Sequence, residues 1–294
     1  MKSLEESLSQ PEGKKKGRKP KRTAQKELIN MYYEEVGIER DSKEVQSYYA
    51  NKSIVENYQH LSPLEKQRFE SKFTQPKNVH QEQYLKLLQQ KSKKIIVVSG
   101  PAGTGKTLFA VENGVRNFLL GKIDKLIFTR PSVSVDEDLG YLPGTLEEKM
   151  APWVRPIYDV LYQFLTPKDV QQQMEDKLIE IAPLGYMRGR TFKNTWIIAD
   201  EMQNSTVAQM KMLLTRLGEN SRLIITGDLE QYDRPDTING LEDFLQKFKG
   251  KRSSSISNFE FERADIQREE VVKEVLDIYS GECIPQNYLD EEDS

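Results

Sequence analysis

The sequence has 294 residues, of which 37% are hydrophobic and 30% charged, and a net charge of −3. These values are typical of a globular protein with one or two hydrophobic cores. Cys283, the single cysteine, cannot form an internal disulfide, and no apolar run approaches the roughly 18 residues that span a bilayer. We therefore expect a cytoplasmic protein with no membrane partner, and we exclude a disulfide-stapled scaffold.

The first 26 residues carry nine Lys or Arg against three Glu, although the whole chain is net negative. They also include two Pro, two Gly and few large apolar side chains, a composition that cannot offset the entropy lost on ordering. We predict a basic flexible tail over residues 1–26, which either binds nucleic-acid phosphates as an arm or is a solvated or localising tail. Residues 283–294 are predicted to be a short acidic C-terminal tail.

Between the tails, the hydrophobic pattern predicts two regions. Residues 27–77 have weak apolar faces and a Ser-Pro helix start at Ser62, which predicts a short helical accessory region. Helical spacing is clear from Val207 to Leu217, where Thr206 and Gln209 resemble a capping box. Continuous apolar runs predict strands buried on both faces of a mainly parallel sheet at 95–98, 126–128, 196–199 and 223–225. This alternation predicts an α/β domain over residues 78–282.

The strongest chemical signal follows the first predicted strand and precedes a helical pattern. It matches G-x-x-x-x-G-K-[ST] at Gly100, Pro101, Ala102, Gly103, Thr104, Gly105, Lys106 and Thr107. Glycines let the backbone wrap closely round phosphates, Lys106 reaches the β and γ oxygens, and Thr107 ligates Mg²⁺. The strand–loop–helix context is the one this motif requires, so we predict a nucleoside triphosphate site.

Two carboxylates follow the predicted strand at 196–199. Asp200, at the carboxyl end of the strand, is suited to hold Mg²⁺, and Glu201 is suited to orient and deprotonate an attacking water. A phosphotransferase would need no base directed at water, so Glu201 favours hydrolysis over phosphoryl transfer. The alternative is an exposed acidic turn after a strand.

A third polar motif, G-D-L-E-Q, follows the run at 223–225 and ends at Gln231. A polar side chain at a strand end beside the phosphate loop can contact a γ-phosphate, so Gln231 or Asp228 could report whether that group is present. The alternative is a tight turn with no such contact.

The three motifs are similar to motifs I, II and III of superfamily 1 helicases, and longer stretches resemble the PhoH family of phosphate-starvation-inducible ATPases. The most specific stretches lie at 129–131, 138–144, 182–191 and 209–216. The resemblance runs from about residue 78 to residue 279, roughly two-thirds of the chain. The first 75 residues do not contribute, although a basic tail is consistent with a phage-encoded member, which would work in the host cytoplasm.

The resemblance implies a RecA-like P-loop NTPase domain that uses ATP and Mg²⁺, remodels RNA or single-stranded DNA, and forms homo-oligomers such as hexameric rings. It also implies roles for three further residues. Gln81 is similar to a glutamine that reads the adenine edge, with Gln83 as an alternative register. Arg130 matches helicase motif Ia, which contacts the nucleic-acid backbone. Arg268 matches an arginine before the family's final helix and is a candidate arginine finger, although its neighbours Gln267 and Glu269 depart from the family pattern.

The residues themselves offer a second argument for nucleic acid. Arg188 and Arg190 flank a glycine in a loop with Tyr186, which suits phosphate clamping and base stacking. The alternative is a pair of structural salt bridges to the sheet. The sequence thus predicts an ATPase acting on RNA or single-stranded nucleic acid. A nucleotide-gated interaction module with incidental turnover and a small-molecule kinase are the alternatives.

Overall fold

The computed structural model describes residues 62–131, 146–233 and 238–268, with positions 271, 272, 275 and 278, and the side chains of residues 146–153 are not described. Its centre is a six-stranded sheet in the order β3-β2-β4-β5-β1-β6, and every neighbouring pair of strands is parallel. The strands are β1 (Ile95–Ser99), β2 (Lys125–Arg130), β3 (Ile179–Pro183), β4 (Thr195–Ala199), β5 (Arg222–Gly227) and β6 (Ile256–Glu260). The predicted α/β fold with a mainly parallel sheet is therefore confirmed.

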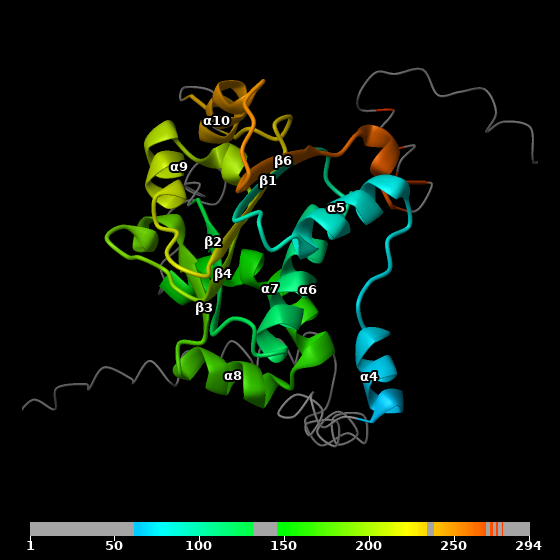
Figure 1. Ribbon diagram of the computed structural model, residues 1–294. Helices are drawn as coiled ribbons and strands as arrows, with labels where there is room; N and C mark the ends of the chain where they lie inside the picture. Colours follow the sequence, from blue (N-terminus) through cyan, green and yellow to red (C-terminus); the bar gives the residue numbers. More distant parts are fainter. Residues whose placement is uncertain are drawn as a thin grey trace, which may run out of the picture.

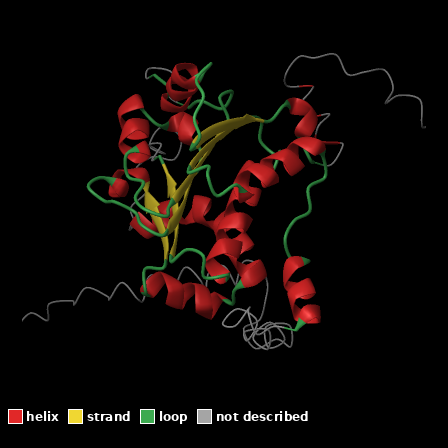
Figure 2. Ribbon diagram, viewed as in Figure 1, coloured by secondary structure: helices red, strands yellow, loops and turns green. Residues whose placement is uncertain are grey.

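The helices lie on both sides of the sheet (Figures 1 and 2). One hydrophobic cluster joins α5 (Val79–Gln89), α6 (Lys106–Leu119) and α7 (Leu146–Phe164) to residues such as Ile96, Phe128 and Trp196. A second cluster joins α9 (Val207–Leu214) and α10 (Gly240–Phe248) to the opposite strand residues, including Val97 and Ile197. Successive strand residues point to opposite faces, so both faces of the central strands are apolar. Helix α8 (Pro167–Glu175) packs against β3.

Four of the six strands coincide with the predicted apolar runs, whereas β3 and β6 were not predicted. These two are the edge strands of the sheet. Each has half-buried or exposed positions within it, so neither has the continuous apolar run that marks the central strands. An edge strand is covered less completely than a central strand, so it does not need the continuous apolar run that predicted the other four strands.

Helix boundaries follow local capping. Helix α4 (Pro63–Glu70) begins at the predicted Ser-Pro start, where Ser62 forms a capping box with Glu65. The predicted capping box of Thr206 and Gln209 begins α9. Helix α9 ends at Leu214 rather than continuing to Leu217. The next hydroxyl, of Thr215, donates to carbonyls of the last turn, and the chain then bonds to the segment before β4.

The described part of the predicted accessory region packs on the domain core. Phe69 and Phe73 are buried in the first cluster, and the Phe73 ring stacks on Phe164 with centroids 4.5 Å apart. The predicted tails, residues 1–26 and 283–294, and residues 27–61 lie outside the described residues, so their boundaries stay predictions. Among the residues that the structure describes, no helix combines the length and hydropathy needed to cross a membrane.

Candidate active site

The phosphate-loop motif lies between the end of β1 and the start of α6, at the carboxyl edge of the parallel sheet. Gly100, Gly103 and Gly105 all have positive φ angles, of 134°, 84° and 91°. Helix α6 begins at Lys106, so its free N–H groups and positive dipole end adjoin the loop. This is the backbone arrangement that the sequence motif predicts.

Lys106 is 8% exposed, and its Nζ donates to the carbonyls of Gly100 and Pro101 at 2.5 and 2.6 Å. Burial lowers the pKa of Lys106, while the charges of Asp228, Asp200 and Glu201 act in the opposite direction. The ammonium group is thus held inside its own loop by bonds to carbonyl oxygens, which an anionic acceptor such as a phosphate oxygen could replace.

Asp200 lies directly after β4 and faces the first turn of α6. Its Oδ1 accepts hydrogen bonds from the hydroxyls of Thr107 at 2.8 Å and Thr226 at 2.5 Å. Mg²⁺ prefers hard oxygen ligands such as hydroxyl and carboxylate groups. It is often bound by only one or two protein groups, with substrate phosphates as further ligands. No group of three or more His, Cys, Asp or Glu suited to a metal occurs in the described ranges. Thr107 and Asp200 therefore fit a metal that arrives with phosphates.

Glu201 is the next residue and has φ 52° and ψ 39°, a left-handed conformation that is uncommon outside glycine. Its carboxylate lines a cavity of 370 Å³ together with Lys106, Thr107, Asp200 and Gln231. The structure thus brings five predicted residues, from three separate strand ends, to one cavity. Asp228, the alternative to Gln231, also lines it.

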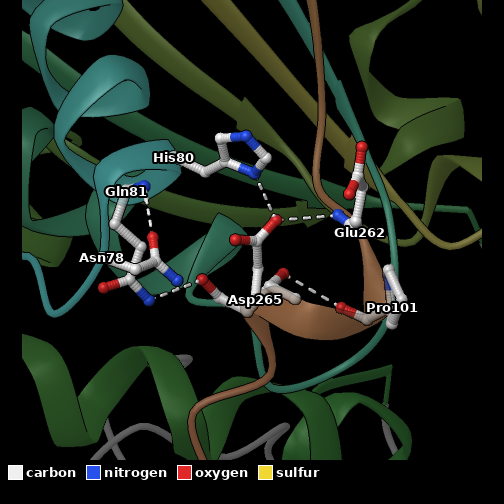
Figure 3. Close-up of polar contacts among 7 residues, drawn as sticks. Asn78, His80, Gln81, Pro101, Glu262 and Asp265 are labelled. Carbon is white, nitrogen blue, oxygen red and sulfur yellow. Dashed lines mark hydrogen bonds and ion pairs between the residues drawn. The ribbon is translucent and has the colours of Figure 1, made fainter.

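Gln81 lies behind the phosphate loop and does not line this cavity. It is 3% exposed, its Nε2 donates to the Thr104 carbonyl at 3.0 Å, and its Oε1 accepts from the Lys77 N–H at 2.8 Å. Figure 3 shows Gln81 and Asn78 at the start of α5 beside the loop. In this conformation Gln81 supports the loop, and its predicted contact with adenine stays a prediction.

Arg268 lies against the phosphate loop of its own chain. The Gln267 N–H donates to the Gly103 carbonyl at 3.0 Å, and Nε of Arg268 lies 2.6 Å from the position that a Cβ on Gly103 would occupy. A residue larger than glycine at 103 would therefore collide with this side chain. The sequence does not say whether Arg268 acts on the nucleotide of its own chain or on that of a neighbouring subunit. In this structure its side chain lies against the phosphate loop of its own chain.

The three candidate nucleic-acid residues have different surroundings. Arg130 ends β2 and pairs in register with Pro183, next to η2 (Leu184–Met187), which carries Tyr186 at 61% exposure. Arg188 follows η2 and is exposed. Arg190 donates to both oxygens of Glu180, at 2.5 and 2.7 Å, and this hydrogen bonding raises its pKa. Arg190 thus makes the structural salt bridge that was the alternative interpretation.

Gln203 and Thr226 also belong to this site, although neither was predicted as a functional residue. Both side chains are fully buried. Thr226 bonds Asp200, and Gln203 bonds Glu201. Their only sequence signal is a position within two residues of the predicted motifs, which does not reveal where their side chains point.

Comparison with known proteins identifies the same family that these motifs resemble. The model of the PhoH-like protein family matches residues 74–280. The chain belongs to the PhoH-like family.

The PhoH-like relatives include proteins from Synechocystis, at 42% identity over 69% of this chain, and Bacillus subtilis, at 47% over 61%. Protein PhoH of Escherichia coli is 42% identical over 69% of the chain. The matched regions cover 61%, 56% and 57% of those three relatives, so this chain spans somewhat more than half their length.

Solved structures give a more distant likeness. The Pif1 helicase from Candida albicans is 14% identical, with a TM-score of 0.36 over 73% of this chain and 46% of that one. A Hef helicase domain from Pyrococcus furiosus is 11% identical, with a TM-score of 0.36 over 60% of this chain and 37% of that one. The family assignment rests on the sequence relatives.

Proposed function

We propose that this PhoH-like chain is a Mg²⁺-dependent ATP hydrolase. One observation carries the proposal: the Thr107 hydroxyl meets the Asp200 carboxylate at 2.8 Å, in the same cavity as Lys106 and Glu201. Metal ligands, a phosphate-binding cation and a base are the groups that hydrolysis of a nucleoside triphosphate needs. They come from widely separated parts of the chain, so their convergence supports a built site.

Each residue has a defined task in this proposal. Bound Mg²⁺ would neutralise phosphate charge and orient the leaving group. Thr107 and Asp200 would hold it, and Lys106 would exchange its loop carbonyls for phosphate oxygens, which accept a charged donor more strongly. Glu201 would accept a proton from the attacking water, and Gln231 would contact the γ-phosphate. The base in the cavity favours hydrolysis over both the kinase and the interaction-module alternatives.

We further propose that hydrolysis is coupled to RNA or single-stranded DNA, with the chain acting as a helicase-like remodeller. The supporting observation is the adjacency of Arg130, Tyr186 and Arg188 at the carboxyl edge of β2 and β3. Arg188 is exposed and Arg130 is half-buried, whereas Arg190 pairs with Glu180, so the proposed phosphate contacts fall to Arg130 and Arg188. The proposal extends to homo-oligomers in the cytoplasm.

The test is phosphate release from ATP by the full chain, with and without excess EDTA, in the presence and absence of RNA and single-stranded DNA. We expect turnover that EDTA abolishes, that Lys106→Ala removes, and that a single-stranded polymer stimulates. The matched control is Lys93→Ala, because Lys93 lies outside the cavity and its Nζ donates to the Ser253 carbonyl at 3.0 Å. Equal turnover by wild type and Lys106→Ala would contradict the proposed site. Stimulation by neither polymer would contradict coupling to nucleic acid.

A further inference from the structure

Gln203 connects two segments of the cavity that are separate in sequence. It lies in η3 (Met202–Asn204) and is fully buried. Its Nε2 donates to Glu201 Oε2 at 2.5 Å and to the Gln231 carbonyl at 3.1 Å. Its Oε1 accepts from the Asp228 N–H at 3.1 Å. All three hydrogen bonds end on residues that line the cavity.

The orientation of this amide follows from its partners. A carboxylate and a carbonyl only accept hydrogen bonds, and a backbone N–H only donates, so the opposite amide orientation would oppose all three contacts. Close packing also confines it, because a Cβ on Gly227 would lie 2.8 Å from Gln203 Oε1. Gly227, the glycine of the G-D-L-E-Q motif, has no side chain, and the Gln203 amide occupies the space that a side chain there would need.

We propose that Gln203 is a positioning residue for hydrolysis, which fixes the Glu201 carboxylate relative to the 228–231 loop. This inference rests on the proposed function of Glu201 as the base. Glu201 follows a strand in an uncommon backbone conformation, and among the described residues the hydrogen bond that its carboxylate accepts comes from Gln203. Without Gln203, its carboxylate would sample rotamers that point away from the attacking water. The bond to the backbone carbonyl of Gln231 would hold the 228–231 loop at a fixed distance from the Glu201 carboxylate.

Asn204 provides a matched control. It is 1% exposed, and like Gln203 it ties η3 to the loop after β5. Its Nδ2 donates to Asp233 Oδ2 at 2.7 Å, and its Oδ1 accepts from the Asp233 N–H at 3.0 Å. In the described part of the chain, its side chain makes no hydrogen bond to Glu201. The side chains of Gln203 and Asn204 are therefore both buried and both bonded to the loop after β5. They differ because only Gln203 bonds the Glu201 carboxylate.

The experiment compares Gln203→Met with Asn204→Leu, two nearly isosteric changes, in the full chain. We measure kcat and KM for ATP, the Kd for ADP, and thermal unfolding. Gln203→Met should lower kcat about tenfold or more, a part of the contribution of a general base, and change the Kd for ADP less than about threefold. Asn204→Leu should lower kcat less than about threefold. If Gln203→Met does not fold, Gln203→Asn is used, since it keeps a neutral amide but is one methylene shorter than the side chain that reaches Glu201.

A double-mutant cycle with Glu201→Gln separates positioning from general destabilisation. If Gln203 acts through Glu201, Gln203→Met should change the residual rate of Glu201→Gln by less than about twofold. The inference is overturned if Gln203→Met has wild-type kcat, if Asn204→Leu loses as much, or if the loss is the same in both backgrounds. A wild-type rate in Glu201→Gln alone would instead remove the proposed base, and with it this role for Gln203.

Discussion

At the scale of single residues, the left-handed backbone at Glu201 is the least ordinary feature of the site. A non-glycine residue in this conformation costs about 1 kcal/mol or more and persists where surrounding contacts determine it. Here Asp200, the preceding residue, accepts hydrogen bonds from two hydroxyls, and Gln203 donates a hydrogen bond to the Glu201 carboxylate itself. The turn thereby directs the Glu201 carboxylate into the cavity that holds Lys106.

Glu201→Gln should retain binding of Mg²⁺ and ATP while turnover falls by about a hundredfold or more. The amide keeps the size of the side chain and leaves Asp200 and Thr107 intact, but it cannot accept a proton from water. The measurement is phosphate release beside the Kd of a fluorescent ATP analogue. Undiminished turnover would assign the base to another residue.

Arg188→Gln should weaken binding to single-stranded RNA and reduce the slope of log affinity against log salt by about 0.7, the value for one phosphate contact. Lys193→Gln is the control, because Lys193 is exposed and lies just before β4, at the opposite end of that strand from Asp200. Fluorescence anisotropy at several salt concentrations measures both. Equal slopes for the two variants would exclude a specific contact of Arg188.

At the scale of elements, the segment after β6 bonds both the last residue of β1 and the phosphate loop that follows it. The Phe261 N–H donates to the Ser99 carbonyl at 2.9 Å, and the Gln267 N–H donates to Gly103 at 3.0 Å. Between them, Asp265 in η4 (Arg263–Asp265) accepts from the Glu262 N–H and pairs with His80 at 2.7 Å (Figure 3). Helix α5 and this segment are thus joined beside the loop, although 185 positions separate His80 from Asp265.

The His80–Asp265 pair predicts a pH-dependent stability. The hydrogen bond to Asp265, with the charges of Asp265 and Glu262, raises the pKa of His80 above its ordinary value of 6.5. A group with a raised pKa stabilises the folded state fully below the unfolded pKa, and this contribution disappears as the pH rises through the folded value. The stability difference between wild type and His80→Gln should therefore be larger at pH 5.5 than at pH 8.5. Urea unfolding at both values measures it, and equal differences would contradict the pair.

The elements also show where sequence patterns succeed. The central strands and α6 were predictable because burial on two faces, or one apolar helix face, leaves a periodic signal. The phosphate loop was predictable because its glycines and lysine are adjacent in sequence. The contacts of Gln203, of Arg268 with Gly103, and of His80 with Asp265 were not, since each joins side chains whose approach depends on how strands and loops pack.

At the scale of the whole molecule, the phosphate-loop motif occurs once in the chain, and Arg268 lies against it. In a homo-oligomer, an arginine that acts in trans would let a mixture of Lys106→Ala and Arg268→Ala subunits regain activity. Because Arg268 adjoins its own Gly103, we expect the mixture to hydrolyse ATP no faster than the two variants measured separately. Each variant mixed with wild type is the control, and recovered activity would show action in trans.

Deletion of residues 1–26 should weaken binding to single-stranded RNA mainly at low salt, because nine cations displace counterions without reading bases. Basal hydrolysis should be unchanged, since the phosphate loop begins more than seventy residues downstream. The measurement is the salt dependence of RNA affinity, with basal turnover as the control. A truncated chain with the original affinity and salt slope would show that the tail serves another purpose.

The amino-acid sequence by itself determined the α/β class, the four central strands, the phosphate loop and the acidic residues expected to act with it. These features leave local signals: apolar runs, helical spacing and short motifs of fixed residue types. Only the tertiary structure decided that Gln81 supports the loop from behind, that Arg190 is paired with Glu180, and that Gln203 holds Glu201. A side chain's partner depends on distances between segments remote in sequence, and those distances are set by the packing of the whole sheet and its helices.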